Sequence, residues 1–294
     1  MKQVEQITLT DEQVRALQAK NLEIAKYFAA FCRENGVKFF LTGGSCLGAV
    51  RHQGFIPWDD DIDLFMLAPD FEKLKEVWPR KADTARYSLC YETRDYNDHH
   101  LTPTVRDNNT TFITKETWDR DVNQGVALEI GILNACPESA AGQKLQLIFA
   151  AAASLFKAQR LPNRQSRLVY NASRVLLGVF RSEGVRYFLW NTAEKIATVS
   201  NRRFSSATYV REFTMFPYIR WLYPREWFDE AVDVPFEDTM LPVPKGSREY
   251  LEKRYGNYME LPPEKDRHPE HRVVFMDLER PYTEYRGKYY YVNQ

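Results

Sequence analysis

Few cysteines and no long hydrophobic run occur in this sequence. The four cysteines (Cys32, Cys46, Cys90 and Cys136) are widely spaced and form no CxxC pair, so we expect neither disulfides nor a structural zinc site. The longest apolar run, Leu145 to Phe156, is too short for a membrane-spanning helix of about 20 residues. The first ten residues lack the basic and apolar segments of a signal peptide. These absences predict a cytoplasmic protein.

The chain also has no net charge, because 40 basic residues balance 40 acidic ones. The distribution along the chain is nevertheless uneven. Residues 157–225 contain 13 lysines and arginines, mostly arginine, and only 3 acidic residues. Such a segment is either a set of helices with basic solvated faces or a surface for phospholipid head groups, a polyprenyl phosphate or a phosphorylated glycan. We expect peripheral contact with an anionic membrane, at its inner face, through residues 145–225, and no nucleic-acid partner.

The periodicity of apolar residues predicts an α/β (α+β) fold. A capping box at Thr10–Gln13 begins a helix that ends near Gly36. Residues 140–205 are rich in Ala, Leu, Arg and Phe at helical spacing, which predicts an Arg-rich helical insertion in a single domain over residues 1–294. Further strands are expected at 37–41, 61–66, 87–91, 101–106, 126–133, 232–236 and 240–243, and helices at 71–78 and 247–255, followed by a loop-like C-terminal end.

Four carboxylates, those of Asp59, Asp60, Asp61 and Asp63, lie within five positions. Such a cluster resists burial unless a cation lies among its members. Asp61 and Asp63 alternate around Ile62 at the start of an apolar strand, and residues i and i+2 of a strand face the same way. The pattern favours a site for Mg²⁺, with Mn²⁺ as the alternative metal, over a solvated acidic turn. Asp59 and Asp60 belong to the preceding turn and are secondary candidates.

The turn Gly43-Gly44-Ser45 precedes this cluster and is suited to phosphate binding. Glycines let backbone N–H groups approach a phosphate, and the Ser45 hydroxyl can donate to one of its oxygens. Glu129, the lone charge in the apolar run 126–133, is the expected third metal ligand; the alternative is a carboxylate at a strand edge facing water. Together these features are typical of the nucleotidyltransferase superfamily.

Several longer stretches resemble the LicD family, the bacterial relatives of fukutin. The most specific are residues 41–64, LTGGSCLGAVRHQGFIPWDDDIDL, and residues 250–263, YLEKRYGNYMELPP; residues 105–112 and 242–245 also fit. The resemblance extends from roughly residue 20 to 275. It implies a nucleotidyltransferase-like mixed sheet with flanking helices, and a metal-dependent transferase. The group moved would be a phospho-alcohol, typically phosphocholine, taken from a CDP-linked donor and given to a cell-surface glycan.

This chain departs from the family at Glu129-Ile-Gly-Ile-Leu-Asn134, where aspartate is common at both ends. Glutamate can still ligate Mg²⁺, but its longer arm shifts the metal. Asn134 cannot act as a base or as an anionic ligand. The donor or the acceptor can therefore differ from the family norm.

Further residues are candidates for substrate binding. Arg51 can reach a phosphate or be a surface arginine, and Trp58 can stack on a base, contact a quaternary ammonium or pack in a turn. Arg106, by resemblance, faces the site. In the C-terminal motif region the candidates for phosphate or acceptor binding are Lys245, Arg254, His268 and His271, although a lone histidine is more often structural.

The resulting hypothesis assigns Asp61, Asp63 and Glu129 to the metal and to catalysis, and Gly43, Gly44 and Ser45 to the donor pyrophosphate. An acceptor hydroxyl on a glycan or lipid-linked glycan (a teichoic acid, lipopolysaccharide or capsule precursor) attacks the phosphorus nearest the alcohol, and CMP leaves. Alternatives are transfer of ribitol or glycerol phosphate from a CDP-donor, a true nucleotidyltransferase, and a catalytically inactive glycan-binding module.

Overall fold

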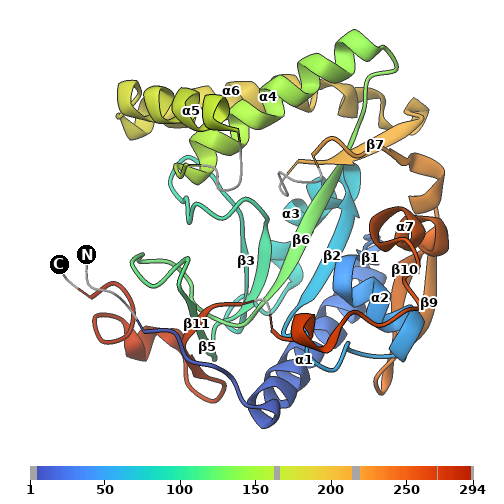
Figure 1. Cartoon of the computed structure of the whole chain (residues 1–294), viewed down its shortest axis with the longest axis vertical. Coiled ribbons are helices and arrows are strands. Elements are labelled where there is room, and N and C mark those ends of the chain that lie inside the picture. The colour runs from blue at the N-terminus through green and yellow to red at the C-terminus, as the bar shows by residue number, and fades with distance from the viewer. Residues whose placement is uncertain (1–4, 162–165, 214–218, 270, 293–294) are drawn as a thin grey trace.

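A mixed β-sheet forms the centre of the computed structural model, which describes residues 5–161, 166–213, 219–269 and 271–292 (Figure 1). The main strand order is β1-β2-β6-β4-β3, and β7 and β8 extend the sheet beside β6. β2 and β6 are parallel, whereas their other pairings in this sheet are antiparallel. The strands are β1 (Phe40–Leu41), β2 (Ile62–Leu67), β3 (Tyr87–Cys90), β4 (Thr104–Asp107), β6 (Ala127–Ala135), β7 (Tyr209–Glu212) and β8 (Tyr223–Pro224). The predicted α+β class is confirmed.

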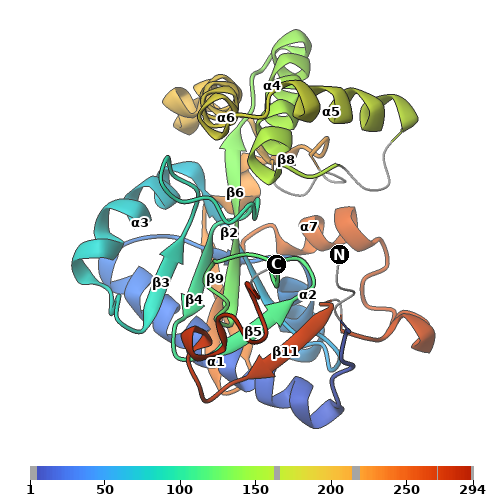
Figure 2. The same cartoon turned by 90° about the vertical axis from the view of Figure 1, so that its left-hand side faces the viewer.

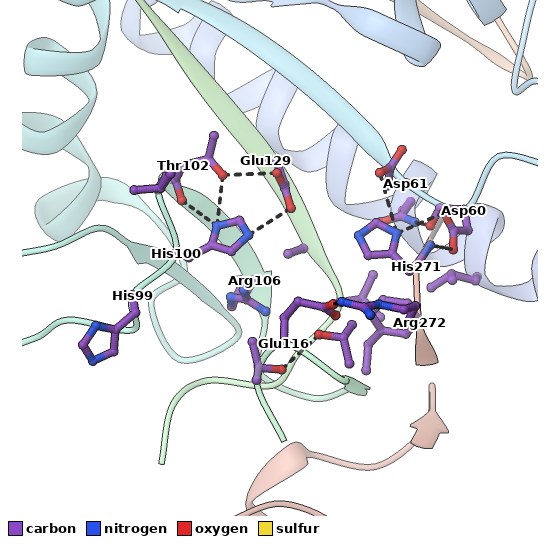
Figure 3. A pocket seen from close by; sticks show the side chains of 18 of the residues that line it. Asp60, Asp61, His99, His100, Thr102, Arg106, Glu116, Glu129, His271 and Arg272 are labelled. Atoms are coloured by element: carbon purple, nitrogen blue, oxygen red, sulfur yellow. Dashed lines mark hydrogen bonds and ion pairs between the residues drawn. The ribbon is translucent and has the colours of Figure 1, made fainter. Parts of the chain in front are cut away.

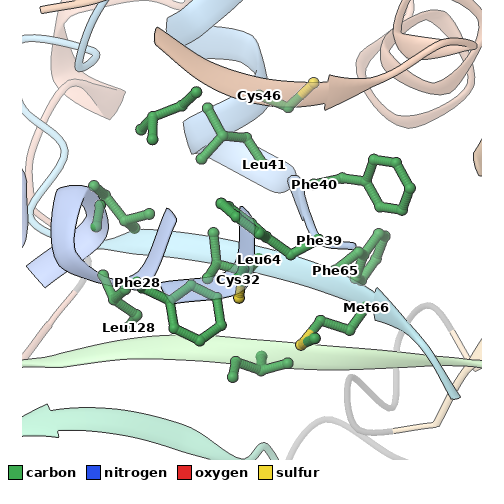
Figure 4. Packing of buried hydrophobic residues seen from close by; sticks show 14 of the residues in the cluster. Phe28, Cys32, Phe39, Phe40, Leu41, Cys46, Leu64, Phe65, Met66 and Leu128 are labelled. Carbon is green, nitrogen blue, oxygen red and sulfur yellow. The ribbon is translucent and has the colours of Figure 1, made fainter. Parts of the chain in front are cut away.

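Helix α1 (Asp11–Asn35) begins and ends at the predicted signals. The Thr10 hydroxyl accepts from the backbone N–H of Gln13, whose side chain in turn accepts from the Thr10 N–H. The helix stops at Gly36, which has a φ of 60° that glycine adopts without strain. One face of α1 is buried against the strands that carry the acidic cluster (Figure 4). The Phe28 ring and the Leu64 and Leu128 side chains are fully buried there, and each such side chain contributes about 1.5–3 kcal/mol.

The remaining elements of the core surround this layer. Helix α2 (Gly43–His52) connects β1 to the acidic turn, and α3 (Ala68–Lys81) follows β2. The hairpin of β9 (Ala231–Phe236) and β10 (Thr239–Pro244) leads to α7 (Ser247–Tyr255), as the sequence predicts. Short 3₁₀ helices occupy Val199–Ser206 (η1), Arg225–Phe228 (η2), Glu264–Asp266 (η3) and Tyr282–Tyr285 (η4).

Three helices lie together at one end of the molecule, away from α1 (Figures 1 and 2). They are α4 (Ala140–Ala158), α5 (Arg167–Val179) and α6 (Glu183–Ala197), which agree with the helices predicted for this segment. Among the described residues, no helix combines the length and the apolar character needed to cross a membrane. The expectation of a single domain stays a prediction.

The C-terminal end is not the loop that the sequence predicted. Strand β11 (Val273–Asp277) pairs antiparallel with β5 (Thr111–Thr114) in a separate two-stranded sheet. The prediction was wrong because β11 is short, does not alternate between apolar and polar residues, and finds its partner about 160 residues earlier in the chain. This pairing places His271, just before β11, beside the acidic turn.

Glycine 48 provides a test of the packing of α2. A Cβ there would lie 2.4 Å from the backbone oxygen of Gly54. Gly48→Ala should therefore lower the free energy of unfolding by about 1–3 kcal/mol in urea titrations, although alanine normally favours a helix. The control is Gly178→Ala in α5, where a Cβ meets nothing within 4 Å. That change should raise the stability by up to about 1 kcal/mol. Equal effects would contradict the packing of α2.

Candidate active site

The parallel pairing of β2 with β6 brings the predicted carboxylates together. Asp63 lies directly opposite Glu129, and Glu129 lies opposite Thr104 of β4 on its other side. Asp61 comes two residues before Asp63, so its side chain is directed to the same face of the sheet. Three acidic side chains from two distant segments therefore share one region.

Burial raises the pKa of Asp63 to about 7, and repulsion from Glu129 and Asp59 adds to this, against the attraction of Arg254. Burial and the Asp63 charge also raise the pKa of Asp61 well above its ordinary value. Carboxylates held close enough to oppose one another's ionisation fit a hard divalent cation, which would replace repulsion by attraction. The oxygen donors present are of the type that Mg²⁺ and Mn²⁺ prefer.

A histidine that the sequence analysis missed is paired with Glu129 (Figure 3). Nε2 of His100 lies 3.3 Å from Oε1 of Glu129, and the Thr102 hydroxyl donates to Oε2 at 3.1 Å. Burial disfavours the charged form of both side chains, but the attraction between the two opposite charges outweighs this effect. The pKa of Glu129 falls to about 2 and that of His100 rises to about 9. The His99-His100 doublet in a polar connection was the available signal.

Asp60 and His271 form a second pair beside the first (Figure 3). The buried Asp60 carboxylate lies 3.0 Å from Nδ1 of His271 and accepts from its backbone N–H, while the Asn21 amide donates to the Asp60 carbonyl. Asp60, Asp61 and His271 offer donor atoms within 4.8 Å of one another. This cluster shares only Asp61 with the predicted metal-ligand set, which stays a prediction.

The turn at Gly43-Gly44-Ser45 packs directly on the carboxylates. Gly43 has a φ of 54°, and a Cβ at Gly44 would lie 2.5 Å from Oδ2 of Asp59. The Ser45 hydroxyl accepts from the backbone N–H of Asp63 at 2.9 Å, which leaves its own proton for another acceptor. The Gly43 N–H already donates to the Tyr250 hydroxyl. The glycines are thus needed for close approach of the turn to the acidic strand.

Two cavities meet at Asp61, which lines both. We call the first, of about 450 Å³, the histidine cavity, and the second, of about 610 Å³, the tryptophan cavity. The histidine cavity includes Asp60, His99, His100, Thr102, Arg106, Glu129, Arg160, His271 and Arg272. The tryptophan cavity includes Gly44, Arg51, Trp58, Asp59, Asp63, Arg254, Tyr255, Tyr258 and His268.

Most of the other predicted binding residues line one of these cavities. Arg106 is buried in the histidine cavity, where its guanidinium donates to the Thr104 hydroxyl and the Gly125 carbonyl. Arg51, in the tryptophan cavity, donates to the carbonyls of Tyr258 and Glu260. Trp58 has the guanidinium of Arg267 5.6 Å from its ring centroid. A quaternary ammonium on that face of the ring would have to replace Arg267.

Two residues lie elsewhere. Lys245 is exposed, pairs with Glu230 at 3.2 Å and lines neither cavity. Asn134, the position of the family's second aspartate, accepts from the Asn201 amide and so ties β6 to η1. It lies five residues along β6 from Glu129, roughly 17 Å at the usual rise per residue. Asn134 therefore lies away from Glu129, and it lines a separate cavity with Lys157 and Glu194.

The strand pair, the glycine turn and the acidic side chains together indicate a nucleotidyltransferase-type domain. Comparison with known proteins agrees, because residues 36–127 match the family model described as LicD/FKTN/FKRP, nucleotidyltransferase domain. The resemblance to the LicD family noted in the sequence is thereby confirmed for these residues.

Three relatives extend the comparison. The lipopolysaccharide cholinephosphotransferase LicD of Haemophilus influenzae is 25% identical over 277 residues, which cover 91% of this chain and 97% of that protein. The mouse ribitol 5-phosphate transferase FKRP is 29% identical over 111 residues, 33% of this chain and 22% of its own. An uncharacterised protein of Rickettsia prowazekii is 34% identical over 97 residues, 31% of this chain and 36% of its own.

Removal of one repelling carboxylate should stabilise the metal-free protein. The folded-state pKa of Asp63 lies above its ordinary 3.8, so the charged form opposes folding as pH rises from about 4 through about 7. In the presence of a chelator at pH 8, Asp63→Asn should raise the free energy of unfolding by at least about 1 kcal/mol, because one pKa unit is about 1.4 kcal/mol. Below pH 4 the gain should vanish.

The same variant should lose stabilisation by Mg²⁺ or Mn²⁺ in thermal unfolding. Asp95→Asn, at an exposed position, is the matched control and should change neither quantity. A less stable Asp63→Asn protein at pH 8 would show that repulsion does not govern this cluster.

Proposed function

We propose that this protein is a metal-dependent transferase that moves a phospho-alcohol group to a hydroxyl of a cell-surface glycan. The preferred donor is CDP-choline, and the acceptor is a teichoic acid, lipopolysaccharide or capsule precursor. The observation that carries the proposal is the parallel pairing of β2 and β6, which sets Asp63 opposite Glu129, while Asp63 itself lies against the glycine turn. The Haemophilus relative, a lipopolysaccharide cholinephosphotransferase matched over 91% of this chain, supports the same reaction class.

Asp61, Asp63 and Glu129 would hold the Mg²⁺ or Mn²⁺ ion. When bound, such an ion supplies positive charge to the phosphate oxygens and so lowers the barrier to displacement. Glu129 is the weakest candidate for a general base, because His100 holds its pKa near 2, far from neutral pH. Deprotonation of the acceptor would fall to one of the other site carboxylates near its hydroxyl.

The two cavities suggest where the substrates bind. The tryptophan cavity offers Trp58, Tyr255 and Tyr258 for a nucleobase, with the guanidinium groups of Arg51 and Arg254 for the diphosphate. The histidine cavity offers Arg106 and His100 to a polar acceptor. In the transfer, the acceptor oxygen forms a bond to the phosphorus nearest the alcohol. The bond from that phosphorus to the bridging oxygen breaks, and CMP leaves with that oxygen.

Two related activities use the same site. The mouse relative is a ribitol 5-phosphate transferase, and its match favours ribitol or glycerol phosphate as the second choice of transferred group. A true nucleotidyltransferase would instead release pyrophosphate. A catalytically inactive binding module would release neither product.

We place the protein in the cytoplasm, peripheral at the inner face of the membrane. The four cysteines are free and buried, in keeping with a reducing compartment. CDP-linked donors and a lipid-linked acceptor would meet at this face.

Product analysis tests the reaction. With CDP-choline and Mg²⁺, the protein should release CMP, and Asp61→Ala should lower the rate about 10³-fold, the equivalent of about 4 kcal/mol of lost charge stabilisation. The folded state should persist by circular dichroism, and Asp95→Ala should keep full activity. Release of CMP from CDP-ribitol or CDP-glycerol, but not from CDP-choline, would assign a different donor. Release of pyrophosphate from CTP would assign a nucleotidyltransferase reaction instead. Unchanged turnover by Asp61→Ala would refute the metal assignment.

We propose that the tryptophan cavity binds the donor and the histidine cavity binds the acceptor. Separate measurements of donor cleavage and of group transfer test this assignment. Arg254→Gln should raise the KM for the CDP-linked donor about tenfold or more, since it removes a charge-assisted contact. Arg106→Gln should leave the slow, metal-dependent hydrolysis of the donor by water within twofold, while transfer to a glycan acceptor falls. The opposite pattern would exchange the roles of the two cavities.

A further inference from the structure

Helix α5 exposes an apolar stripe that the rest of the described chain does not cover. Leu168, Val175 and Val179 are 79%, 59% and 68% exposed. Their spacing of seven and four residues places them on one face of the helix. In α5 only Ser173 is buried, so this helix contributes little to the core. Leu168 and Val175 of this stripe, together with Ala172 and Leu176, line a shallow groove along the helix.

Positive charge borders the stripe. Arg167 and Arg174, seven residues apart and both exposed, lie on the neighbouring face with Asn171 between them. Residues 157–225, which contain this helix, hold 13 basic and only 3 acidic residues. An apolar face flanked by arginines is the pattern of a helix that lies in the head-group region of a membrane.

We propose that α5 docks on an anionic lipid bilayer, with its apolar stripe at the acyl boundary and its arginines on the lipid phosphates. The sequence predicts membrane contact through residues 145–225, and this proposal narrows the contact to α5. In α4, which contains the apolar run 145–156, Ala150, Ala153 and Phe156 are buried. Within the described structure Ser173 is the buried residue of α5, so Leu168, Val175 and Val179 remain available for contact with lipid.

Charge favours a bilayer over a second copy of this chain. A symmetric dimer through this face would bring Arg167 and Arg174 against the same arginines of the other copy. Anionic head groups remove that repulsion, and each arginine near such a surface adds attraction. A bilayer therefore accepts both the apolar stripe and its basic border.

The end of α5 is held next to the histidine cavity. The Arg186 guanidinium donates to the Leu177 carbonyl of α5 at 2.9 Å and to Oε1 of Gln159 at 2.5 Å. The neighbours of Gln159 in the chain, Ala158 and Arg160, line the histidine cavity. Docking through α5 would bring this cavity close to the membrane, which suits a lipid-linked acceptor. That last step rests on the proposed function, whereas docking itself does not.

Vesicle flotation of the full chain tests the proposal without donor or acceptor. The wild-type protein should float with vesicles containing phosphatidylglycerol at low salt, and much less with pure phosphatidylcholine vesicles or at 1 M salt. Leu168→Glu/Val175→Glu should abolish flotation. Arg174→Gln should weaken partitioning about fivefold, the equivalent of about 1 kcal/mol for one arginine. Val232→Glu, the same change at an exposed valine of β9, should float like the wild type.

Unchanged circular dichroism and thermal unfolding will show that the double variant folds. The Arg174→Gln variant measures the contribution of the basic border independently of the double variant. Failure of the wild type to float with anionic vesicles would overturn the proposal. So would flotation that survives the double substitution. Self-association without lipid that is lost in the double variant would assign the face to a second copy instead. Donor cleavage in solution should be the same in all these variants, which separates failed docking from a failed assignment of the reaction.

Discussion

Parallel hydrogen bonding between β2 and β6 is the constraint on which the site depends. The pairing places Asp63 opposite Glu129 and fixes Asp61 at the entrance of β2. The surrounding apolar side chains, such as Leu64 and Leu128, hold this register, because a slip by one residue would turn the carboxylates into the core. The same packing that stabilises the sheet therefore forces three negative charges together. A strained electrostatic arrangement of this kind persists in a stable fold when function requires it.

The two histidine pairs limit this strain without removing it. His100 compensates Glu129 on one side, and His271 compensates Asp60 on the other. Asp63 is attracted by Arg254 and His271, yet burial and repulsion from Glu129 and Asp59 outweigh this attraction and raise its pKa to about 7. The distribution of compensating charge thus leaves the centre of the cluster as the place where a cation would be most strongly attracted.

The amino-acid sequence was sufficient for the elements that depend on local pattern. Alternation around Ile62 predicted a strand that directs Asp61 and Asp63 together, and the lone charge in an apolar run singled out Glu129. The capping box at Thr10 and the stop at Gly36 were read from neighbouring residues. His100 was missed because its contacts with Thr102 and Glu129 depend on the conformation of the loop that carries it, which the sequence pattern does not predict. Lys245 was selected by resemblance alone, and the structure places it at the surface with Glu230.

The pairing of β5 with β11 has a consequence for how the protein is made. Thr111–Thr114 leaves the ribosome long before its partner Val273–Asp277, so this sheet cannot form until Val273–Asp277 has been synthesised. Until then the Asp60 carboxylate lacks His271, and the wall of the histidine cavity that His271 and Arg272 supply is missing. A nascent or C-terminally truncated chain would present the acidic strand without its enclosed cavity. Completion of the site therefore waits for the synthesis of His271, Arg272 and the strand that follows them.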